Sequence, residues 1–186
     1  MKTGIFVLLT ILLFSACQSN RGNYSSPNPT QPTTVISLAP GPISINSLIP
    51  YQNENAIQIN IRQECNLGQQ LSEYITSHAV EQGLAINRVN QINPQGPGNV
   101  LVIEITNAIS MGNAFIGHSK ATSVQGKLYE NGTLKGGFTG GRRSMGGVFA
   151  GFKGSCSVLD RTVKVLGEDI ARWLKHPTDN ARLGDQ

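Results

Sequence analysis

The residues of this 186-residue chain that could do chemistry do not form a catalytic or metal-binding pattern. Its three histidines, at positions 78, 118 and 176, share no metal-ligand spacing. None of the local motifs of serine hydrolases, zinc peptidases, dinucleotide-binding proteins or P-loop proteins is present. Asp160 and Asp169 lie too far apart along one predicted helix to act together as a general acid and base. We therefore expect no enzymatic activity, no metal ion and no cofactor.

The three cysteines differ in their surroundings. Cys17 follows the apolar run Ile5–Phe14 and two small residues, which is the pattern of a secretory signal. Cys65 and Cys156 would then lie in an exported domain, where two cysteines usually pair. Both precede a predicted helix, so the two helix N-termini could meet and favour a disulfide. A pair of reactive thiols, with the pKa lowered by the helix N-termini, is the alternative.

The residues from Leu13 to Cys17, Leu-Phe-Ser-Ala-Cys, resemble the lipobox of bacterial lipoproteins. This resemblance implies that residues 1–16 are a signal peptide and that Cys17 is lipidated with fatty acids such as palmitate. Gln18 follows the cysteine, in place of the aspartate that favours retention in the inner membrane. We therefore expect an outer-membrane lipoprotein facing the periplasm. An ordinary signal peptide with a chance cysteine is the alternative.

Residues 17–34 are rich in Pro, Ser and Asn and predict an extended, lipidated tether without a core. The net charge of +4 includes Lys2, which belongs to the predicted signal peptide. Such a weak positive charge, without a dense basic face, argues against a nucleic-acid partner. The expected partners are the membrane, through the lipid on Cys17, and an envelope protein or a cell-wall polymer.

Alternating and helical apolar patterns predict one α+β domain over residues 35–177. Ala56–Arg62 alternates and predicts a strand, and Val100–Ile109 predicts the most buried strand. Between them, Asn66–Gly83 predicts a helix with a capping box, and Leu84–Val89 predicts a short strand. A last helix is predicted from near Ser157 to Pro177. The expected fold is an antiparallel or mixed sheet with two helices packed on one face.

Asn131 and Gly132 separate two strand-like runs and predict a type I′ hairpin, in which Glu130 pairs with Thr133 and Gln125 with Phe138. The same asparagine fits the N-glycosylation pattern, which is the alternative use of this site. Residues 178–186 predict a disordered tail.

The glycine-rich segment Gly136–Gly154 predicts a strand end that runs into a loop. Arg142 and Arg143 could clamp an anionic group, and Phe149 and Phe152 could supply apolar contacts. We expect these four residues to form a partner contact. A membrane-inserting hairpin and simple structural packing are the alternatives.

The order of these elements, behind a lipobox and a tether, resembles small Gram-negative outer-membrane lipoproteins. They include penicillin-binding-protein activators and curli-secretion lipoproteins. A closer resemblance is to a domain-of-unknown-function group with a glycine-rich stretch, here Gly140–Gly151, before an amphipathic helix, here Asp160–Trp173. We expect a lipoprotein that binds or scaffolds an envelope partner. The alternative is a subunit of a secretion-associated oligomeric ring or channel.

Overall fold

The computed structural model describes residues 36–113, 117–146 and 154–185 of the chain. The predicted signal peptide, Cys17 and the whole predicted tether lie outside the described residues. Phe149 and Phe152 also lie outside them.

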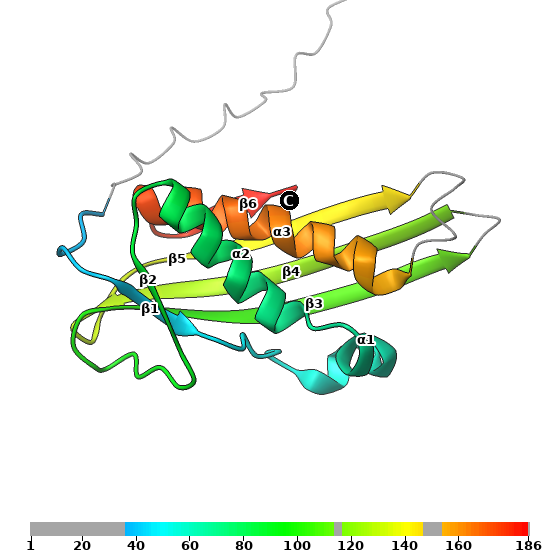
Figure 1. The fold of residues 1–186 in the computed structure, drawn as a ribbon, viewed down its shortest axis with the longest axis horizontal. Helices are drawn as coiled ribbons and strands as arrows, with labels where there is room; N and C mark the ends of the chain where they lie inside the picture. Colours follow the sequence, from blue (N-terminus) through cyan, green and yellow to red (C-terminus); the bar gives the residue numbers. More distant parts are fainter. Residues whose placement is uncertain (1–35, 114–116, 147–153, 186) are drawn as a thin grey trace, which may run out of the picture. The chain divides into compact units, whose positions relative to one another are not determined.

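The described strands form one six-stranded mixed sheet in the order β2-β1-β3-β4-β5-β6. Three long antiparallel strands make its centre, while β1 runs parallel to β2 and β3, and β6 runs parallel to β5 (Figure 1). The strands are β1 (Ile43–Asn46), β2 (Ile86–Val89), β3 (Asn99–Asn113), β4 (Gly117–Glu130), β5 (Thr133–Gly146) and β6 (Ala181–Gly184).

Two long helices, α2 (Leu67–Glu81) and α3 (Ser155–Lys175), pack against each other and cover one face of the sheet (Figure 1). A 3-10 turn, η1 (Glu54–Ala56), and a short helix, α1 (Ile59–Glu64), precede α2. The predicted α+β class, with a mixed sheet and two helices on one face, is confirmed.

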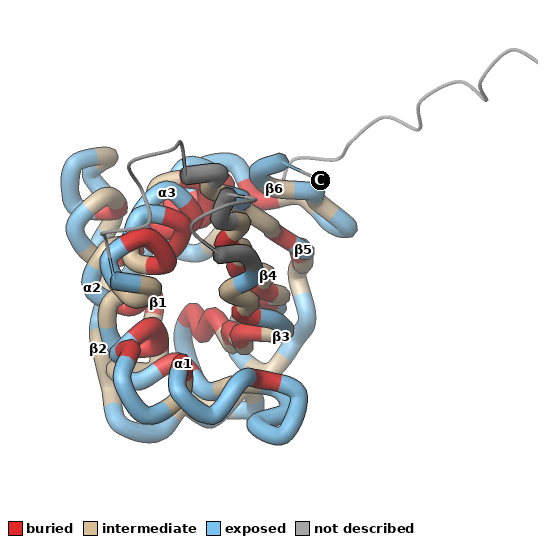
Figure 2. The backbone as a smooth tube through the Cα atoms, turned by 90° about the vertical axis from the view of Figure 1, so that its right-hand side faces the viewer, coloured by how far each residue is buried: buried red, intermediate tan, exposed pale blue. Residues whose placement is uncertain are grey.

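The core lies between the helices and the sheet, where the buried segments gather (Figure 2). Along β3, alternate residues point into this core, and α2 and α3 each contribute one apolar stripe. The largest fully buried side chains of these three elements are Leu101, Ile105, Leu67, Leu71, Ile75, Leu159, Leu166 and Ile170. No helix of the described residues covers the second face of the sheet.

The predicted strand Ala56–Arg62 is wrong, because this segment ends η1 and forms most of α1. Ile57 and Ile61 are buried, whereas Ile59 between them is 61% exposed. Ile57 lies in the extended link between η1 and α1, and Ile59 is the first residue of α1. The alternation of isoleucines therefore crosses a helix boundary, and Ile57 reaches the core from the link while Ile61 reaches it from the buried side of α1.

The Asn131-Gly132 hairpin is confirmed, with φ values of 49° and 81° at its two turn residues. Glu130 pairs with Thr133 as predicted, but Phe138 pairs with Gly126 and not with Gln125. A register shift at Leu128 and Tyr129 inserts the extra residue, because a β-bulge places two residues opposite one.

The glycine-rich segment is more regular than predicted, since β5 continues through it to Gly146. Gly136 faces neighbours that leave no room for a side chain, because a Cβ atom there would lie 2.9 Å from the carbonyl oxygen of Thr178. The fit at Gly140 is less tight, since a Cβ atom there would lie 3.2 Å from Val124 and 3.4 Å from Leu166. These glycines therefore allow close packing within the sheet and below α3.

The predicted disordered tail is wrong over Ala181–Gly184, which forms β6 at the edge of the sheet. The N–H of Asp185 extends this pairing by donating to the carbonyl of Gly141. Four residues are too few for a periodic apolar signal, so the pairing depends on the edge of β5 and not on local sequence.

Candidate functional site

The two predicted partners Cys65 and Cys156 form a disulfide in this structure. Cys65 is the C-terminal cap of α1, and Cys156 lies in the first turn of α3, with 5.1 Å between their Cα atoms. Both side chains belong to the core or pack against it. The bond therefore holds the start of α3 to the segment that leads into α2.

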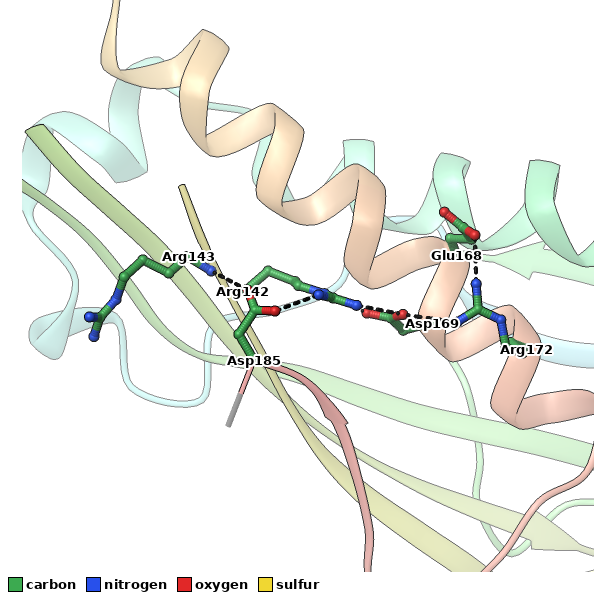
Figure 3. A network of polar contacts seen from close by, with 6 residues as sticks. All are labelled: Arg142, Arg143, Glu168, Asp169, Arg172 and Asp185. Carbon is green, nitrogen blue, oxygen red and sulfur yellow. Dashed lines mark hydrogen bonds and ion pairs between the residues drawn. The ribbon is translucent and has the colours of Figure 1, made fainter. Parts of the chain in front are cut away.

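Arg142 on β5 lies inside a network of ion pairs that includes Asp169 on α3 and Asp185 after β6 (Figure 3). Its Nε and Nη2 atoms donate to the two carboxylate oxygens of Asp169 at 2.8 and 2.9 Å. Arg172, which also pairs with Glu168, approaches the same carboxylate at 3.4 Å. The hydrogen bonds from Arg142 to Asp169 raise the pKa of the arginine.

Arg143, the next residue of β5, behaves differently. It is exposed, and its side chain extends away from the carboxylates (Figure 3). Only its backbone N–H joins the network, by donating to Asp185 at 3.3 Å. The structure therefore separates the predicted arginine pair, because Arg142 is engaged inside the domain and Arg143 remains available at the surface.

A groove of about 750 Å³ lies on the uncovered face of the sheet, beside the hairpin and β6. We call it the sheet groove. Val102 and Glu104 face it, because they alternate with the buried Leu101, Ile103 and Ile105. Its other lining residues are Pro94, Gln125, Gly126, Lys127, Tyr129, Leu134, Gly136, Gly137, Phe138, Thr139, Asp179, Asn180, Ala181 and Arg182.

The sheet groove combines hydrogen-bonding groups, charges of both signs and apolar surface. Gln125 donates to the carboxylate of Glu104 at 2.8 Å, which fixes both side chains on its floor. Lys127 is exposed, and Leu134 is 53% exposed at one end. Such a mixture suits a ligand that offers both polar and apolar groups.

The sequence did not predict this groove, because a strand face with Gln, Lys and Thr resembles any solvated face. The sequence feature that could have indicated the groove is the pair of adjacent glycines Gly136 and Gly137. Because glycine has no side chain, the backbone itself lines the groove at these two positions.

Within residues 36–113, 117–146 and 154–185, no helix is long and apolar enough to cross a membrane. The same ranges contain no group of three His, Cys, Asp or Glu side chains that could hold a metal ion.

These features define a disulfide-linked α+β domain with one uncovered sheet face. No protein-family model and no curated protein matches the chain. Among solved structures, the PelC dodecamer from Paraburkholderia phytofirmans is 15% identical with a TM-score of 0.46, over 73% of this chain and 93% of that chain. A minor lipoprotein from Acinetobacter baumannii is 14% identical with a TM-score of 0.38, over 73% of this chain and 95% of that chain. Both similarities concern the fold alone, and neither assigns a residue role here.

Proposed function

We propose that this chain is an outer-membrane lipoprotein, anchored through Cys17, whose periplasmic domain binds or scaffolds an envelope partner through the sheet groove. The observation that carries this proposal is the uncovered, hollowed face of the sheet. Side chains of both charges, an aromatic ring and exposed Leu134 meet there in one concave surface. This binding role needs no catalysis.

Two independent features support an envelope location. The lipobox-like sequence before Cys17 supplies an export and anchoring signal. The disulfide between Cys65 and Cys156 fits an oxidising compartment such as the periplasm. The lipobox-like sequence and the disulfide lie in different parts of the chain, so neither feature depends on the other.

The binding proposal is tested with the full-length lipidated protein in its own membrane. A photo-crosslinking amino acid replaces Lys127 in the sheet groove or, as the control, Glu168 on the exposed side of α3. We expect a discrete crosslinked product from position 127 only, and we expect Tyr129→Ala to weaken it. Equal products from both positions, or none from position 127, would contradict binding at the groove.

The molar mass of the protein in solution distinguishes the single binding module from the alternative, a subunit of an oligomeric ring. A soluble form that begins at Gln31 is measured by size-exclusion chromatography with light scattering. A monomer agrees with a single binding module, whereas a large oligomer of defined mass favours the ring and contradicts the single-module proposal.

A further inference from the structure

Three polar side chains from separate segments meet beneath the first turn of α3. They are Ser110 on β3, Lys120 on β4 and Ser155 at the start of α3. Ser110 and Lys120 lie directly opposite each other in the antiparallel pair, so their side chains point to the same face of the sheet. This face is the one that α3 covers.

The three side chains form a closed set of hydrogen bonds. Lys120 Nζ donates to the hydroxyls of Ser110 and Ser155, and the second contact is 3.2 Å long. The Ser110 hydroxyl donates to Ser155 Oγ at 3.1 Å. Lys120 is only 5% exposed, whereas Ser155 is partly exposed. The amine is therefore enclosed, whereas the residue that carries the neighbouring hydroxyl is partly exposed.

Burial lowers the pKa of Lys120, and no other group contributes to this shift. The charged residues on the elements around it have other partners or point elsewhere. Arg142 on β5 is bound to Asp169, and Asp160 on α3 accepts from Tyr74. Arg143 is exposed, and Arg62 on α1 pairs with Glu54. Among the described residues, Lys120 thus has no neighbouring carboxylate that would hold it in the charged form.

We infer that Ser155 is a nucleophile activated by Lys120, with Ser110 as a positioning residue, for acyl transfer from small carboxylic esters or amides. This inference goes beyond the proposed binding role and does not depend on it. A serine hydroxyl is a weak nucleophile until an adjacent base takes its proton, and a neutral lysine can serve as that base. A base so placed contributes about 10²- to 10⁴-fold to the rate.

Water is the only co-reactant that the reaction needs. Ser155 Oγ forms a bond to the carbonyl carbon while its proton passes to neutral Lys120 Nζ. When the carbon–oxygen or carbon–nitrogen bond to the leaving group breaks, the ammonium returns that proton to the leaving alcohol or amine. Water then attacks the acyl-serine, its proton restores the Ser155 hydroxyl through Lys120, and the carboxylic acid is released.

A motif search cannot detect this set, because its members come from three segments. Ser110 and Lys120 flank the connection between β3 and β4, and Ser155 follows β5. The disulfide at Cys156 fixes the residue next to the proposed nucleophile.

The test uses the full-length, disulfide-bonded protein and a fluorophosphonate, which phosphonylates an activated serine with loss of fluoride. Peptide mass spectrometry locates the adduct. We expect one adduct on Ser155, with a labelling rate that rises with pH and reaches a plateau as Lys120 becomes neutral. Ser155→Ala should abolish labelling, and Lys120→Met should slow it at least 10-fold. Ser110→Ala should slow it less.

Ser157→Ala is the matched control. Ser157 lies two residues further along α3, is exposed and donates to the carbonyl of Gly154. Its loss should change the labelling rate less than twofold. The inference is overturned if the folded wild-type protein gains no adduct on Ser155, or if folded Lys120→Met is labelled at the wild-type rate. If Lys120→Met does not fold, the pH dependence of wild-type labelling decides. A labelling rate of Ser155 that rises in proportion to hydroxide concentration, without a plateau, would also overturn the inference.

Discussion

Arg142 and Asp169 join β5 to α3 through two parallel hydrogen bonds, although they lie 27 residues apart in the chain. The Asp169 side chain is 6% exposed, so its charge is stabilised by arginine and not by water. A bidentate pair of this kind fixes direction as well as distance. It sets the position of α3 on the strand below.

We predict that Arg142→Ala lowers the free energy of unfolding by about 3 kcal/mol, because it leaves the buried Asp169 carboxylate without its main partner. The matched control is Arg143→Ala, which should change stability by less than about 0.5 kcal/mol because this side chain is exposed. Urea denaturation of both variants measures the difference. Equal effects would show that the network does not hold α3 in place.

Loss of the disulfide should cost much of the stability of the domain. Its cysteines are 91 residues apart, and the chain-entropy relation gives an upper bound of about 4 to 5 kcal/mol for a loop of this length. We compare thermal unfolding of Cys65→Ala/Cys156→Ala with that of the oxidised wild type. Adding reductant to the wild type should reproduce the shift, whereas an unchanged melting temperature would contradict a stabilising bond.

Gly126→Ala should destabilise the domain by about 1 to 3 kcal/mol through overpacking. A Cβ atom there would lie 2.4 Å from the ring of Phe138 on β5. That ring is buried and meets Trp173 edge to face, with centroids 4.8 Å apart. Phe138→Leu in the same chain should recover part of the loss, because the smaller side chain leaves room. Additive effects of the two substitutions would contradict this packing explanation.

Cys17→Ala should remove membrane attachment, because one residue carries the proposed lipid. Metabolic labelling with a fatty-acid analogue measures lipid attachment, and membrane fractionation measures membrane attachment. We expect label and sedimentation with membranes in the wild type and neither in the variant. Label that persists on Cys17→Ala would contradict the lipobox assignment.

Long periodic segments were predictable from the sequence. The helical spacing of Leu71, Ile75 and Ala79 predicted α2, and the alternation of Leu101, Ile103 and Ile105 predicted β3. The cysteine pairing followed from two residues in an exported domain, each next to a helix start.

Features that depend on distant partners were not predictable. The three isoleucines of residues 57–61 alternate as in a strand, but a helix begins at Ile59 and leaves that residue exposed while Ile57 and Ile61 are buried. The tail strand β6 exists because β5 offers an edge. Likewise, the choice of Arg142 over Arg143 as the engaged arginine depends on the position of Asp169 above the sheet.

In the export that we propose for this chain, the spacing of the disulfide also imposes an order of events on maturation. In a chain that crosses a membrane amino terminus first, Cys65 reaches the far side 91 residues before its partner. The three long strands β3, β4 and β5 lie between the two cysteines and arrive during this interval. Until Cys156 follows, Cys65 is exposed to oxidants and to the thiols of other proteins. The native disulfide can therefore form only after the central sheet has passed through the membrane.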